Sequence, residues 1–164
     1  MNNFIPQEDY NKFLESMVLC CVDIVIVHEQ KVLLVKRDTE PAKDQWWLPG
    51  GRLYKGEFLE DCARRKAIEE VGIECNTVRQ LCTKETMFDI GIDNIPIHSI
   101  NTCFLLQPIN NSPQVKLDSF SSDYKWVSTI PEDLDNPYVT SVICKALPHL
   151  ISDSAKYMME IHPY

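Results

Sequence analysis

The sequence predicts an α+β fold in which helices flank a mixed β-sheet, and three observations favour it. Two apolar runs, the first rich in valine and isoleucine and the second in valine and leucine, follow each other near the N-terminus, which is typical of strands. A stretch with helical periodicity follows a pair of glycines, and three strand-like stretches then precede a C-terminal helical stretch. Because the 164 residues contain no repeat and no obvious linker, we expect one domain over residues 1–164.

The N-terminal half of the chain alternates between helical and extended patterns. Residues 7–17 are predicted to form a short helix with one apolar face. Residues 17–29 and 31–37 are predicted strands, and the Glu-Gln pair between them predicts a tight connection. After a polar loop, residues 46–53 (WWLPGGRL) are expected to be extended, with a sharp glycine turn.

The central and C-terminal elements follow from the same patterns. The main helix is predicted from Glu57 to Val71, because Gly72 is a natural C-terminal stop. Pro148 is expected to kink the last helix or end it early. The remaining predicted elements are strands at 76–88, 97–109 and 122–128 and a helix at 137–152.

Charge and composition narrow the classes of partner. A formal net charge of −8 argues against a nucleic acid as the main partner, but a local basic pocket could still bind a phosphorylated small molecule. No apolar run is long enough to cross a bilayer, and the polar, acidic N-terminus resembles no secretory or typical organelle-targeting signal. Seven cysteines without CxxC spacing indicate reduced thiols. We therefore expect a cytoplasmic protein that does not associate with membranes.

The main helix places charges on its apolar face. Lys66 and Glu70 fall on the stripe of small apolar residues, and Glu69 lies at its edge. Burial of a charge costs several kcal/mol unless the charge is paired or binds a metal. One interpretation is an internal ion pair of Lys66 with Glu69 or Glu70. The other is a divalent cation held by the two carboxylates and by carbonyl groups of the preceding Pro-Gly-Gly turn.

Residues 51–73 resemble the Nudix box, G-x5-E-x7-R-E-U-x-E-E-x-G-U, in which U is aliphatic. Eight of the nine specified positions match, and the exception is Lys66, where the family has a glutamate. The resemblance implies a Nudix-type α/β/α sandwich and a Mg²⁺ cofactor, with Mn²⁺ as the alternative ion. It also implies Glu69, Glu70 and the carbonyl of Gly50 as metal ligands. The matching positions are Gly51, Glu57, Arg65, Ala67, Glu69, Glu70, Gly72 and Ile73, and Glu57 and Arg65 are expected to brace the loop and helix.

Outside the box, several segments are similar to the GDP-mannose mannosyl hydrolase branch of the family, among them residues 22–53 and the segment SDYKWVS. This resemblance implies cleavage of the glycosidic bond of a nucleoside diphosphate-sugar such as GDP-mannose, and a homodimer. Arg37 and Arg52 match the diphosphate-contacting arginines, and arginine suits that role because its planar fork donates paired hydrogen bonds. The expected catalytic residues are Arg37, Arg52 and Glu70.

The chain departs from that branch where the branch carries a Gln-His pair, because Phe120 and Ser121 stand there. Glu85, Asp118 and Asp123 are alternative candidates for the general base, and His98 is the strongest candidate among the histidines. Lys66 is a further candidate, either as a neutral base or, more simply, as a phosphate contact.

A tryptophan completes the expected substrate-binding set, because its ring can stack on a nucleobase. Trp46 and Trp47 are adjacent, so at most one faces a ligand if both lie in a strand, and we assign this role to Trp46. The substrate-binding set is then Arg37, Arg52, Lys66 and Trp46. Two alternative functions stay open: cleavage of the pyrophosphate bond, and binding of a nucleotide sugar without catalysis. The base and the sugar are not determined.

Overall fold

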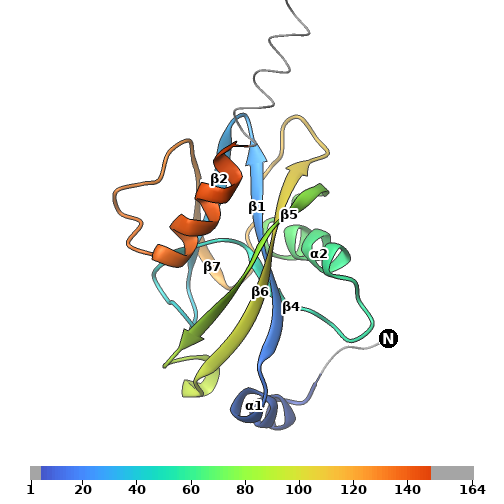
Figure 1. The fold of residues 1–164 in the computed structure, drawn as a ribbon, viewed down its shortest axis with the longest axis vertical. Helices are drawn as coiled ribbons and strands as arrows, with labels where there is room; N and C mark the ends of the chain where they lie inside the picture. The colour runs from blue at the N-terminus through green and yellow to red at the C-terminus, as the bar shows by residue number, and fades with distance from the viewer. Residues whose placement is uncertain (1–4, 149–164) are drawn as a thin grey trace, which may run out of the picture.

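The computed structural model describes residues 5–148, and its centre is a mixed β-sheet (Figure 1). The strand order is β3-β2-β1-β6-β5, with β4 paired to β1 and β7 paired to β2. The pair β1–β6 is parallel and all other pairs are antiparallel, so the predicted mixed sheet is confirmed. The strands are β1 (Leu19–His28), β2 (Lys31–Arg37), β3 (Trp46–Trp47), β4 (Gly50–Arg52), β5 (Cys75–Phe88), β6 (Ile97–Pro108) and β7 (Ser121–Val127).

Strand β1 lies in the middle of the sheet and contacts β2, β4 and β6. Its central residues are buried on both faces, which explains the near-continuous apolar run in the sequence. The predicted tight connection to β2 is confirmed, since Glu29 and Gln30 have φ values of 47° and 60°. Positive φ at both central residues is the geometry of a two-residue hairpin turn.

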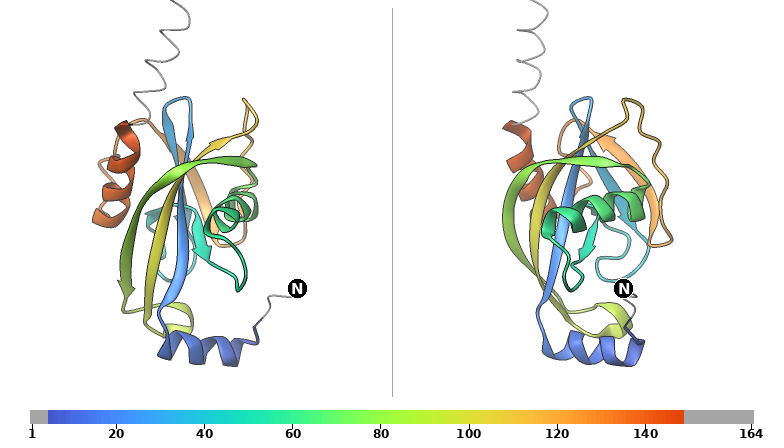
Figure 2. Two further views of the ribbon diagram at one scale, coloured as in Figure 1. Left: turned by 45° about the vertical axis from the view of Figure 1, so that its right-hand side comes forward. Right: turned by 90° about the vertical axis from the view of Figure 1, so that its right-hand side faces the viewer.

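Helices cover both faces of the sheet, as the predicted α/β/α architecture requires. Helix α2 (Leu59–Val71) packs on one face and the C-terminal helix (residues 137–148) packs on the other. Figure 2 shows the two helices on opposite sides of the strands. Each face has its own apolar cluster: Cys62, Ala63, Ala67 and Val71 of α2 join one, and Val139, Val142, Ile143 and Ala146 of the C-terminal helix join the other.

Two predicted boundaries were wrong, for local reasons. The stretch 46–53 is not one extended segment but the strands β3 and β4, which pair with β2 and β1 respectively. Pro49 lies between them and has no N–H for a ladder hydrogen bond. Helix α2 begins at Leu59 and not at Glu57, because the Glu57 carboxylate instead accepts a hydrogen bond from the Tyr54 N–H at 3.0 Å.

The helix α1 (Gln7–Ser16) confirms the predicted N-terminal helix to within one residue. The C-terminal helix begins at residue 137 as predicted and includes Pro148, and the predicted continuation over residues 149–152 lies outside the described residues. Within residues 5–148, no helix has the length and apolar character that a bilayer crossing requires.

Candidate functional site

A cavity of about 410 Å³ lies beside the glycine turn of β4. Its lining includes residues of the segment that resembles the Nudix box and residues of β5 and β6. From Tyr10 to Ser121, the cavity brings together residues that lie up to 111 positions apart in the sequence. Its polar and charged lining consists of Tyr10, Asp23, Arg37, Arg52, Tyr54, Lys66, Glu70, Thr86, Ser99, Asn101 and Ser121.

The glycine turn packs closely against β1 and against the Lys66 side chain of α2. The Gly50 N–H donates a hydrogen bond to Glu70 Oε2 at 2.9 Å. A Cβ on Gly50 would lie 2.3 Å from the Val22 carbonyl oxygen of β1, and one on Gly51 would lie 2.7 Å from Lys66 Cε. A side chain on Gly50 would therefore displace the turn from β1, and one on Gly51 would displace the end of the Lys66 side chain.

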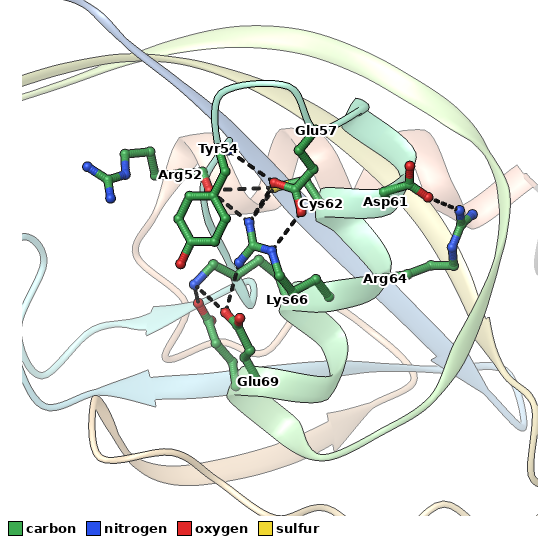
Figure 3. Close-up of polar contacts among 10 residues, drawn as sticks. Arg52, Tyr54, Glu57, Asp61, Cys62, Arg64, Lys66 and Glu69 are labelled. Atoms are coloured by element: carbon green, nitrogen blue, oxygen red, sulfur yellow. Dashed lines mark hydrogen bonds and ion pairs between the residues drawn. The ribbon is translucent and has the colours of Figure 1, made fainter. Parts of the chain in front are cut away.

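Lys66 forms ion pairs with both carboxylates that the sequence singles out. Its ammonium nitrogen lies 3.3 Å from Glu69 Oε2 and 3.2 Å from Glu70 Oε1, and Figure 3 shows Lys66 directed at Glu69. Burial lowers the pKa of Lys66, but the two carboxylates outweigh it, so its pKa is raised and the ammonium stays charged. Burial raises the pKa of Glu70 despite the opposing effect of Lys66. The structure thus contains the internal ion pair of the first interpretation.

These residues do not fit a divalent cation while Lys66 stays between the carboxylates. A Mg²⁺ ion needs oxygen lone pairs at about 2 Å, and the ammonium occupies the space between the two groups. The other oxygen of Glu70 is used by the Gly50 N–H, and Glu69 also accepts from Arg65 at 2.9 Å. Within residues 5–148, no cluster of three or more His, Cys, Asp or Glu side chains could hold a metal ion.

The expected brace between Glu57 and Arg65 is confirmed. Arg65 donates from Nε to Glu57 Oε1 at 2.7 Å and from Nη2 to Glu57 Oε2 at 2.8 Å. Its guanidinium also lies 3.9 Å from the Tyr54 ring centroid and donates to the Arg52 carbonyl at 3.2 Å. The hydrogen bonds from Arg65 hold the pKa of Glu57 at about 2. This pair fixes the loop between β4 and α2 (Figure 3).

Arg37 and Arg52, the predicted diphosphate contacts, line the same cavity as Lys66. Arg37 is oriented by a hydrogen bond from Nε to the Pro41 carbonyl at 2.5 Å, and burial lowers its pKa. The Arg52 guanidinium lies 4.6 Å from the centroid of the Tyr10 ring of α1, an attractive cation–π geometry. Three cationic side chains from β2, β4 and α2 therefore converge on one cavity.

Asp23 of β1 also lines the cavity, although it was not among the residues predicted from the sequence. Burial raises its pKa to about 7, although the hydrogen bond from the Tyr138 hydroxyl opposes this. Tyr138 belongs to the C-terminal helix and stacks on Trp47 with ring centroids 5.4 Å apart. The available signal was a single aspartate inside the apolar run CCVDIVIV, because an unpaired buried charge is costly and needs a reason.

Trp46 does not line the cavity, whereas Trp47 does. The Trp46 Nε1–H donates to Asp133 at 3.1 Å, and the Lys125 ammonium lies 4.1 Å from its ring centroid. The stacking of Trp46 on a base stays a prediction, and its position gives it no support. Among the candidate bases, Glu85, Asp118, Asp123 and His98 lie outside the cavity lining, and His98 lies 3.3 Å from Glu85.

A model of the NUDIX domain matches residues 20–137 of the chain. The chain belongs to the Nudix hydrolase family. This Nudix hydrolase is 34% identical over 139 residues to the low-salt glycan biosynthesis protein Agl8 of Haloferax volcanii, and the match covers 82% of this chain and 86% of Agl8. It is 38% identical over 128 residues to the ADP-ribose pyrophosphatase of Methanocaldococcus jannaschii, covering 75% and 69% of the two chains.

The fold of this Nudix hydrolase also matches solved structures. The NUDIX domain of NrtR from Shewanella oneidensis, solved in complex with ADP-ribose, has a TM-score of 0.59 and 25% identity. That match covers 88% of this chain and 94% of the NrtR chain. Nudix hydrolases generally work with a divalent cation such as Mg²⁺ or Mn²⁺, so the position of Lys66 is unusual for a member of this family.

Proposed function

We propose that this Nudix hydrolase cleaves a nucleoside diphosphate linked to a sugar and releases the nucleoside diphosphate and the free sugar. The observation that carries the proposal is the convergence of Arg37, Arg52 and Lys66 on the cavity that the buried Asp23 also lines. Three cations suit a diphosphate, and a carboxylate suits the proton-accepting side of a hydrolysis. The similarity to a glycan biosynthesis protein supports a sugar-linked substrate.

Each group has a distinct role in this proposal. Arg37 and Arg52 donate hydrogen bonds to the diphosphate and stabilise the negative charge that grows on it as the bond to the sugar breaks. Asp23 lies on the neighbouring strand β1 and accepts a hydrogen bond from the attacking water or from a sugar hydroxyl, in place of the histidine that Ser121 replaces. Glu70 holds the turn of β4 through Gly50 and holds Lys66 at the cavity wall.

GDP-mannose is the specific substrate that we propose, because residues 22–53 resemble the mannosyl hydrolase branch. The homodimer and the cytoplasmic location stay predictions from the sequence, as does Mg²⁺ as the cofactor, which the ion pairs of Lys66 do not favour. A second candidate function is hydrolysis of the pyrophosphate bond. Its support is the 38% identity to an ADP-ribose pyrophosphatase. The NrtR complex likewise supports a ligand that resembles a nucleotide sugar.

The test is product analysis in water enriched in ¹⁸O, with GDP-mannose, UDP-glucose and ADP-ribose as substrates. Cleavage at the sugar carbon places ¹⁸O in the free sugar and leaves an unlabelled nucleoside diphosphate. Cleavage of the pyrophosphate bond yields a nucleoside monophosphate and a sugar phosphate, one of which carries the label, and would establish the pyrophosphatase alternative. Binding of a nucleotide sugar without any product would establish the non-catalytic alternative.

Two variants connect the chemistry to the cavity. Arg37→Met removes one diphosphate contact, and we expect kcat/KM to fall by about 10²-fold. Asp23→Asn keeps the shape of the side chain but accepts protons poorly, and we expect kcat to fall more than KM changes. The matched control is Arg64→Met, because Arg64 is a half-exposed arginine of α2 that pairs with Asp61 outside the cavity. Equal activity of all three variants would contradict the assignment of this cavity.

A further inference from the structure

We propose that Lys66 is a tethered cation: its ammonium takes the place between Glu69 and Glu70 that a divalent ion would need, so that this site binds a nucleoside diphosphate without a divalent ion. The inference rests on the proposed function for the class of ligand. It goes beyond that function because it reverses the metal requirement expected for the family. Lys66, the one position that departs from the Nudix box, is then the residue that removes the need for a divalent ion.

The contacts of the two carboxylates support this assignment. Lys66 lies 3.3 Å from Glu69 and 3.2 Å from Glu70, and Arg65 lies 2.9 Å from Glu69. Both carboxylates therefore already have cationic partners within the chain, although Arg65 also pairs with Glu57. A divalent cation could bind these oxygens only after the ammonium had moved away, since like charges repel strongly in a partly buried site.

The Lys66 side chain is held in this place by packing as well as by charge. It lies on α2 three and four residues before its partners, so all three side chains project from one helical face. Only 18% of the side chain is exposed. A Cβ on Gly51 would lie only 2.7 Å from Lys66 Cε, so the absence of a side chain at Gly51 leaves space for the lysine. The position of the Lys66 side chain is therefore fixed by the surrounding structure, unlike that of a lysine in a surface ion pair.

The same ammonium can serve a ligand. A lysine ammonium has three N–H donors, and the pairs with Glu69 and Glu70 use two of them. Lys66 also lines the cavity together with Arg37 and Arg52. The third donor can therefore reach a phosphate oxygen, which gives a diphosphate three cationic contacts that all belong to the chain. The carboxylates orient the ammonium and do not contact the ligand themselves.

The first test measures binding of GDP and ADP by calorimetry, in excess EDTA and in excess Mg²⁺. For the wild-type protein we expect dissociation constants that agree within about threefold between the two conditions, since no contact depends on the ion. Lys66→Met should weaken binding in EDTA by about tenfold or more, which corresponds to one charge-assisted contact. Lys66→Glu should bind in Mg²⁺ and not in EDTA. Loss of wild-type binding in EDTA would overturn the proposal.

The second test measures binding of Mn²⁺ alone by electron paramagnetic resonance, with no nucleotide present. We expect Lys66→Met and Lys66→Glu to bind Mn²⁺ at least about tenfold more tightly than the wild-type protein, because the carboxylates are freed. Equal Mn²⁺ affinity in all three proteins would also overturn the proposal. The control is Lys12→Met, because Lys12 of α1 likewise pairs with two carboxylates, Glu8 and Asp9, but is 63% exposed and lies outside the cavity.

The two tests separate this inference from the proposed function. Neither test requires turnover, so a failure of sugar release would leave both results interpretable. If GDP and ADP bound in neither condition, the diphosphate site itself would be wrong, and the Mn²⁺ measurement would still decide whether Lys66 excludes a metal. Thermal unfolding of each variant, followed by circular dichroism, shows whether a loss of binding arises from a loss of fold.

Discussion

Glu57→Gln should weaken the fold by removing the charge from the brace between the β4–α2 loop and α2. The two hydrogen bonds with Arg65 measure 2.7 and 2.8 Å, and the side chains are 15% and 21% exposed. A pKa of about 2 in place of 4.5 corresponds to about 3 kcal/mol of stability. Solvent screening at this partly exposed pair reduces the expected loss to about 2 kcal/mol. Urea unfolding at neutral pH measures the loss directly.

The contribution of Glu57 to the stability should depend on pH in a definite direction. Because the folded state lowers the pKa of Glu57, its contribution is fully present above about pH 4.5 and is lost as the pH falls toward about 2. The stability difference between wild type and Glu57→Gln should therefore narrow on acidification. The control is Glu60→Gln, since Glu60 lies 3.8 Å from Arg64, is 62% exposed and should cost at most about 0.5 kcal/mol. Equal losses for the two variants would refute the assigned role of the brace.

Two further predictions concern the walls of the cavity. Tyr138→Phe removes the hydroxyl that donates to Asp23, and we expect a loss of about 1–3 kcal/mol in unfolding free energy. Tyr124→Phe on the half-exposed surface serves as the control and should change the stability little. Gly50→Ala places a Cβ 2.3 Å from the Val22 carbonyl oxygen, and we expect it to lower the stability by about 1–3 kcal/mol. A thermal unfolding midpoint equal to that of the wild type would show that β4 can move away from β1 freely.

The fold could be predicted from the sequence because its elements have strong local signals. Alternation of apolar runs and the Gly72 stop gave the strands and the end of α2, and Gly72 adopts the left-handed conformation with φ 70°. The start of α2 could not be placed in the same way, since it depends on a contact between Glu57 and the Tyr54 N–H. The stretch 46–53 also does not show that β3 pairs with β2 and β4 with β1, because these partners lie elsewhere in the chain.

The residues of the candidate site could be predicted only where they lie in a recognisable sequence motif. The spacing within the box brought Lys66, Glu69 and Glu70 together correctly, because helical geometry alone places them on one face. Asp23 and Tyr138 lie 115 residues apart in the chain, and no local pattern links them. The adjacent tryptophans illustrate the same limit, because strand alternation shows that they diverge but not which one faces the cavity.

The bond between Tyr138 and Asp23 makes the cavity depend on both faces of the sheet. Helix α2 carries the motif, yet the C-terminal helix on the other face holds a carboxylate of the same cavity. A truncation that removed residues 137–148 would therefore leave every position of the motif unchanged and still release this carboxylate from its only side-chain donor among the described contacts. A comparison of the motif alone would not distinguish such a shortened protein from the full one, although its Asp23 would have lost the hydrogen bond that orients it.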